Sequence, residues 1–133
     1  MKKLVFILLM VSIIFTMTGC GVEGEIRSYY GNVEEELRSS MYDPSSMIVE
    51  SAVGAHEEGE AYYYYYIRVN GKNRLGAYVG VQGFYYYYNK NTGAADECYG
   101  DRETLARMTI NMAKMCEDVG DEAEHGSYYV KIK

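Results

Sequence analysis

Two unbroken runs of tyrosine constrain the fold of this 133-residue chain more than any other feature. The runs are Tyr62–Tyr66 and Tyr85–Tyr88, and together they hold nine of the 16 tyrosines. Aromatic residues suit the pleated surface of a β-sheet, so both runs are predicted to form strands. Because side chains alternate along a strand, each run must place tyrosine on both faces of the sheet.

The residues that follow the first run indicate which face is buried. One face carries Tyr63, Tyr65, Ile67 and Val69, and the other carries Tyr62, Tyr64, Tyr66 and Arg68. We expect the face with Ile and Val to be the core and the face with Arg68 to be solvated. The outward tyrosines have two open interpretations. They pair across strands as structural contacts, or they form, with Tyr78, a stacking platform for a sugar, a peptide or a partner protein.

Apolar spacing and turn residues predict the remaining elements. Helices are expected over residues 26–41 and 101–119, and strands over 47–53, 61–69, 75–88, 94–99 and 128–132, with a bulge at Gly83. Asn70-Gly71 favours a tight hairpin turn between two of the strands. The predicted fold is a single α+β domain over residues 26–133. It has an N-terminal helix, an antiparallel sheet of three to five strands, and a second helix packed on one face.

The second helix has clear ends and a clear apolar stripe. Asp101 can cap its start and Gly120 can stop it. The apolar stripe consists of Leu105, Met108, Met112, Met115 and Val119. We expect this stripe to pack on the sheet, because an amphipathic helix turns its apolar face to the core.

The first 19 residues have the layout of a secretory signal peptide. Met1-Lys2-Lys3 is a positive start, and residues 4–17 are apolar apart from Ser12 and Thr16. A transmembrane helix is the alternative. It needs about 20 apolar residues, and this run is too short.

The residues at the end of this segment are Met17-Thr18-Gly19-Cys20, and they resemble the lipobox of bacterial lipoproteins, with Met17 where Leu is usual. The resemblance implies cleavage before Cys20, lipidation of Cys20 and a tether over residues 20–25. An ordinary cleaved signal with an incidental cysteine is the alternative. Cleavage leaves 11 Lys and Arg against 19 Asp and Glu, a formal charge of −8. Since anionic lipids repel such a domain, the membrane is expected as a partner only through acyl chains on Cys20.

Three segments of the middle of the chain form a second pattern: Tyr42-Asp43-Pro44-Ser45-Ser46, Val69-Asn70-Gly71-Lys72-Asn73 and Leu75-Gly76-Ala77-Tyr78-Val79-Gly80. Together they resemble small bacterial envelope proteins, often lipoproteins, that carry L-x-D-P-x-S followed by V-N-A-K-N-S-F/Y-G-G-Y-x-G. Gly71, Arg74-Leu75 and Ala77 depart from that pattern. The resemblance covers residues 37–88. It implies an envelope location on the extracytoplasmic side of the cell membrane and supplies no catalytic residue.

Cys98 and Cys116 have two open interpretations. Outside the cytoplasm a disulfide can persist, and a bridge here would stabilise the fold by about 3 kcal/mol. The alternative is two buried free thiols that behave as small apolar residues.

No motif in the chain predicts catalysis. His56 and His125 lie in acidic segments that we expect to be solvated loops, without the spacing of a metal site. We expect no catalytic residue, metal or cofactor, and the acidic charge argues against a nucleic-acid partner. The predicted function is a lipid-anchored surface protein with a non-catalytic binding or structural role in the envelope, with a cell-wall or protein partner. An inhibitor or small enzyme acting on envelope material is the alternative.

Overall fold

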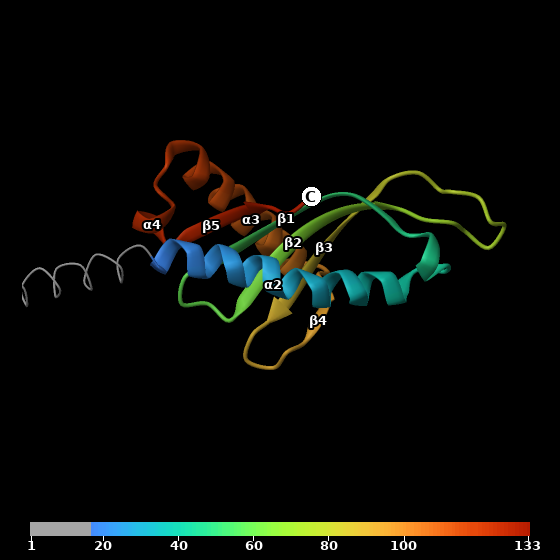
Figure 1. The fold of residues 1–133 in the computed structure, drawn as a ribbon, viewed down its shortest axis with the longest axis horizontal. Helices are drawn as coiled ribbons and strands as arrows, with labels where there is room; N and C mark the ends of the chain where they lie inside the picture. The colour runs from blue at the N-terminus through green and yellow to red at the C-terminus, as the bar shows by residue number, and fades with distance from the viewer. Residues whose placement is uncertain (1–16) are drawn as a thin grey trace, which may run out of the picture.

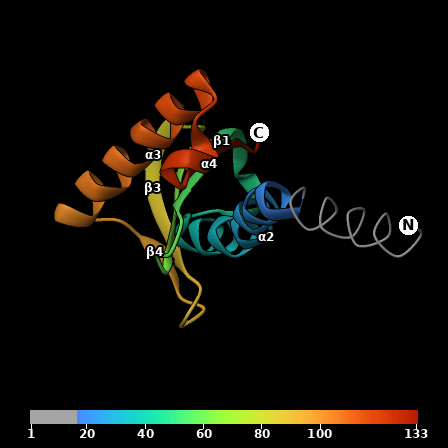
Figure 2. The ribbon, with the colours of Figure 1, turned by 90° about the vertical axis from the view of Figure 1, so that its left-hand side faces the viewer.

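The computed structural model describes residues 17–133, which form three layers (Figure 1). The middle layer is an antiparallel sheet of five strands in the order β4-β3-β2-β1-β5. The strands are β1 (Ile48–Glu57), β2 (Tyr62–Asn70), β3 (Gln82–Asn89), β4 (Ala95–Glu97) and β5 (Ser127–Lys131). Helices α2 (Met17–Ser40) and α3 (Asp101–Val119) cover opposite faces of the sheet (Figure 2). The predicted α+β fold is confirmed, with two short helices, η1 (Pro44–Ser46) and α4 (Glu122–His125), in addition.

Helix α2 packs on the face of the sheet that we predicted to be the core. Its buried residues are Ile26, Tyr30, Val33 and Leu37. Opposite them lie Tyr63, Tyr65, Ile67 and Val69 of β2, each at most 1% exposed, so this prediction is confirmed. The Tyr65 hydroxyl donates a hydrogen bond of 2.7 Å to the carbonyl oxygen of Ile26.

The first helix begins earlier than the sequence indicated. Residues 20–25, which we expected to form a tether, belong to α2. Glu25 explains part of the difference, because its carboxylate accepts a hydrogen bond from the Tyr63 hydroxyl. This contact joins the N-terminal half of α2 to the sheet. Within residues 17–133, none of the helices combines the length and apolar character needed to cross a bilayer. Most of the predicted signal peptide lies outside the described residues.

Helix α3 covers the face of the sheet that we expected to be solvated. The side of the helix that packs on the sheet is not the predicted apolar stripe. Its buried residues are Ala106, Ile110, Ala113 and Cys116. The predicted apolar stripe of Leu105, Met108, Met112, Met115 and Val119 is instead 51–70% exposed. Tyrosine rings already fill the volume on this face of the sheet, so small residues allow the helix to approach it closely. Tyr64 is 5% exposed as a result.

The connection between β2 and β3 also differs from the prediction. Residues 71–81 form a protruding loop rather than a strand after a tight turn (Figure 1). The Asn73 side chain organises it, because Oδ1 accepts hydrogen bonds from the backbone N–H groups of Leu75 and Ala77. Gly83 forms no bulge and pairs in register with Arg68. A Cβ at Gly83 would lie 2.2 Å from the Tyr66 hydroxyl, so glycine leaves room for the Tyr66 ring to lie over this position.

Candidate functional site

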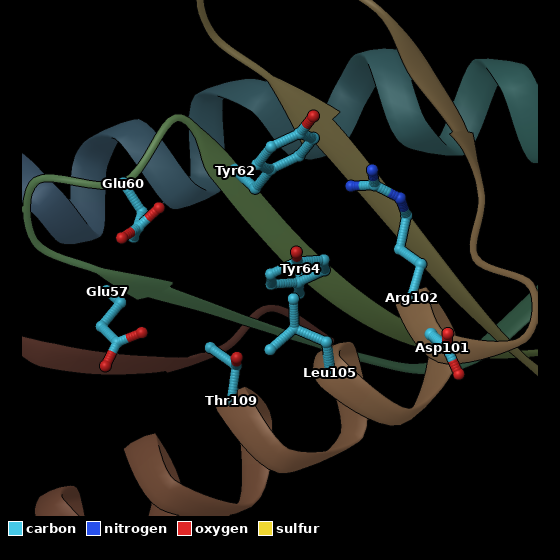
Figure 3. Close-up of a pocket in the computed structure, with 8 residues that line it drawn as sticks. All are labelled: Glu57, Glu60, Tyr62, Tyr64, Asp101, Arg102, Leu105 and Thr109. Carbon is cyan, nitrogen blue, oxygen red and sulfur yellow. The ribbon is translucent and has the colours of Figure 1, made fainter.

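A pocket opens where the first turns of α3 meet the start of β2 (Figure 3). Its volume is about 460 Å³. The lining residues are Glu57, Glu60, Tyr62, Tyr64, Asp101, Arg102, Leu105 and Thr109. They come from the end of β1, the β1–β2 turn, β2 and α3. The sheet and the helix therefore bring together residues that are far apart in the sequence.

Aromatic rings form one wall of the pocket. The rings of Tyr62 and Tyr64 are nearly parallel, with centroids 6.1 Å apart. The Arg102 guanidinium lies 4.5 Å from the centroid of Tyr62 and 4.7 Å from that of Tyr87. Each such cation–π contact is worth about 0.5–2 kcal/mol, so Arg102 is held against these two rings. Burial raises the pKa of Tyr64, which keeps its hydroxyl neutral at physiological pH.

The other wall is acidic. Glu57 and Glu60 lie across the pocket from Arg102 (Figure 3). Within the described part of the chain, no salt bridge involves Glu57, Glu60 or Asp101. The pocket therefore presents aromatic surface beside carboxylates that have no ion-pair partner. This combination suits a ligand that carries both an apolar part and a positive charge.

The structure brings together part of the predicted tyrosine platform. Tyr62 and Tyr64 line the pocket, and Tyr66 lies further along β2, with its ring 4.7 Å from that of Tyr85. Tyr78 lies apart from them. It is in the 71–81 loop at the other end of β2, where the Lys72 ammonium lies 5.5 Å from its ring centroid. Because α3 covers this face, the tyrosines form the wall of a pocket and not an open platform.

The two cysteines are free and buried in the structure, which agrees with the second interpretation, two buried thiols. Cys98 lies just before α3 and Cys116 lies near its C-terminal end. At 1.5 Å per residue, Asp101 and Cys116 are separated by about 22 Å along the helix axis. A disulfide requires Cα atoms less than about 7 Å apart. The sequence showed neither the straightness of this helix nor its direction relative to Cys98.

His56 is not in a solvated loop, contrary to our prediction. It belongs to β1 and is 3% exposed. Its ring stacks on that of Tyr63 with centroids 3.8 Å apart, and Nδ1 donates to the carbonyl oxygen of Tyr62 at 2.9 Å. Burial lowers the pKa of His56, so the folded protein holds it as a neutral imidazole.

The thermal stability of the protein should therefore fall when the pH is lowered from about 7 to about 5. A histidine in the unfolded chain has a pKa of about 6.5. Since the pKa of His56 is lower in the folded state, the unfolded state binds more protons in this range and acid favours unfolding. We expect His56→Phe, which retains a flat ring against Tyr63, to reduce the slope of Tm against pH. His125→Gln is the control and should keep the slope, and equal slopes in wild type and His56→Phe would contradict the assignment.

Nothing in the described residues assembles a metal or thiol centre. Residues 17–133 contain no group of three or more His, Cys, Asp or Glu side chains that could hold a metal ion. Burial raises the pKa of Cys98 to about 12, so its thiol stays protonated and is a poor nucleophile.

The sequence did not identify Arg102, Leu105 or Glu57 as pocket residues. The only available signal for Arg102 was its place in the first turn of a helix that follows a tyrosine-rich strand. Comparison with known proteins adds no candidate, because no protein-family model, curated protein or solved structure matches this chain.

Proposed function

We propose that this chain is a lipid-anchored bacterial surface protein with a non-catalytic binding role in the cell envelope. The anchor is supported by Cys20, which follows an apolar run and the residues Met17-Thr18-Gly19. Ile26, six residues after Cys20, is fully buried against the sheet. Six residues of helix span about 9 Å, so acyl chains on Cys20 would hold the domain close to the bilayer. The 71–81 loop, at the far end of α2, would then point away from it (Figure 1).

The pocket beside α3 is the observation that carries the binding role. Its lining combines two tyrosine rings, Leu105 and carboxylates, and includes neither His nor Cys. Glu57 and Glu60 are exposed to solvent and not enclosed. An accessible surface of aromatic and charged groups is typical of recognition, whereas catalysis requires a nucleophile or a general acid and base in converging positions.

Replacing Cys20 with Ala should release the protein from membranes. Lipidation needs the thiol, and two acyl chains supply the affinity that the acidic domain lacks. The measurement is the distribution between membrane and soluble fractions, together with incorporation of an alkyne-labelled fatty acid. Cys116→Ala is the matched control and should stay with membranes and keep the label. Sedimentation of Cys20→Ala with membranes, or Met1 intact on the mature wild type, would refute the anchor.

Replacing Tyr62 with Ser should weaken retention of envelope material by about fivefold or more, as loss of a central aromatic contact does. Tyr62 is half-buried at the pocket, so Tm should change by only a few degrees. The measurement is capture of isolated cell-wall and membrane fractions by the full chain. Tyr99→Ser, at a site 68% exposed, is the control and should bind as wild type does. Unchanged capture by Tyr62→Ser would indicate that the tyrosines are structural.

A further inference from the structure

Helix α3 exposes an apolar stripe along its whole length. Leu105, Met108, Met112, Met115 and Val119 recur at intervals of three and four residues and are 51–70% exposed. Single exposed apolar residues are common, but a continuous stripe marks an interaction surface. Methionine strengthens this reading, because its flexible thioether adapts to the shape of a partner and is enriched at interfaces.

The stripe borders a groove and not a flat surface. The pocket described above is the first of three hollows along α3, and the other two have volumes of about 180 and 350 Å³. Leu105 and Thr109 line both the first and the second hollow, and Met112 lines both the second and the third. The three hollows are therefore consecutive parts of one groove. From Leu105 to Val119 it is about 21 Å long, or four helical turns.

Among the described residues, the carboxylates of the groove lining that form no salt bridge lie toward the start of α3. Glu57, Glu60 and Asp101 line the first hollow, near the start of α3, and Glu57 also borders the second. The positive group of the lining is Arg102, which lies against two tyrosine rings. Asp118, near the far end, is paired with Lys114. The groove therefore joins an apolar floor to an unpaired acidic end.

We propose that this groove binds an amphipathic helix of a partner protein. The apolar side chains of that helix pack on the apolar stripe of α3, and its Lys or Arg residues lie beside Glu57 and Glu60. The proposal rests on the binding role proposed above and states the chemistry of the partner. A helix of about four turns matches the length of the groove. The acidic end sets its direction, because the basic residues must lie near the start of α3. A second copy of this chain is a poorer occupant, since both copies carry a net negative charge and repel each other in either relative direction.

The test uses the full chain, purified from membranes in zwitterionic lipid nanodiscs, and three labelled synthetic helices of about four to five turns. The first peptide carries Leu on one helical face and Lys on the flanks. The second has Glu in place of Lys, and the third has the same composition with Leu spread around the helix. Fluorescence anisotropy, corrected with empty nanodiscs, gives Kd. We expect the first peptide to bind about tenfold more tightly than either of the others.

Variants of the chain locate the site. Met112→Lys places a positive charge in the groove, which repels the Lys residues of the first peptide. It should raise the Kd of that peptide by about tenfold or more. Leu75→Lys is the matched control in the 71–81 loop, at a site 91% exposed, and should leave Kd unchanged. The double change Glu57→Gln and Glu60→Gln should weaken binding by about fivefold. Met112 is exposed, so circular dichroism should show wild-type melting for its variant.

Four results would overturn the proposal: no binding of the first peptide, equal binding of all three peptides, equal effects of Met112→Lys and Leu75→Lys, or a dimer in sedimentation that Met112→Lys dissociates. The last would make a second copy the occupant. Suppose that the first peptide shows no binding while Tyr62→Ser still captures less envelope material and Cys20→Ala is still released from membranes. In that case the proposed function stands and only the proposed partner is wrong.

Discussion

Replacing Tyr65 with Ala should lower the free energy of unfolding by about 3–5 kcal/mol, the range for a large aromatic removed from a core. Tyr65 is fully buried between the sheet and α2. Its ring lies 6.0 Å from that of Tyr30, and its hydroxyl donates to the carbonyl oxygen of Ile26. The change therefore opens a cavity and removes a hydrogen bond that joins the strand to the helix.

Urea denaturation, monitored by circular dichroism, measures this loss of free energy. Two control variants separate the contribution of the hydroxyl from that of the buried ring. Tyr65→Phe removes only the hydroxyl and should cost about 1 kcal/mol, the usual net value of a buried hydrogen bond. Tyr42→Ala changes a side chain that is 64% exposed and should cost no more than about 0.5 kcal/mol. A loss for Tyr65→Ala as small as that for Tyr42→Ala would show that α2 does not pack on this face.

The same substitution, Gly to Ala, should have opposite effects at two positions. At Gly54 in β1, an added Cβ would lie 2.5 Å from Cγ2 of Ile26 and 2.9 Å from Cε1 of Tyr65. The sheet and α2 would have to separate, so Gly54→Ala should lower the free energy of unfolding by about 1–3 kcal/mol. At Gly31 in α2 an added Cβ would have no neighbouring atom within 4 Å. Gly31→Ala should therefore raise the free energy of unfolding by about 0.5–1 kcal/mol.

Measuring both variants under the same conditions makes the comparison strict, because the chemical change is identical. A similar effect at both positions would mean that Gly54 is not in close contact with Ile26. The sign of the difference is therefore a test of the packing of the N-terminal helix.

Local patterns predicted much of the fold. The alternation in β2 identified Tyr63, Tyr65, Ile67 and Val69 as the buried face, because side-chain direction is set by the strand itself. The bounds of α3 were also predicted. Asp101 is its first residue but does not cap it, because the N-cap position is Gly100 and no side chain there accepts a capping hydrogen bond. Gly120 ends the helix with a φ of 77°, which glycine adopts without strain.

The candidate site was predicted only in part. Tyr62 and Tyr64 follow from the tyrosine run, but Arg102 and Leu105 join them only because α3 lies across this face of the sheet. Tyr78 was expected nearby and lies in a loop at the other end of β2. The burial of His56 depends in the same way on its neighbour in space, Tyr63. Contacts between distant segments leave no periodic signal in the sequence.

The sequence by itself determined that five strands form, which face of β2 is buried and where α3 lies in the chain, since these depend on steric preferences of neighbouring residues, although the bounds of β1 and β3 differ from the prediction. Only the tertiary structure decided which side of α3 is buried. Hydrophobicity favoured the side with Leu105 and Met112, but the side that packs on the tyrosine rings carries Ala106, Ile110 and Ala113, two of which are small enough for a close approach. The side of α3 that is buried is therefore set by the available volume rather than by apolar character alone. The apolar stripe is left exposed to solvent as a result.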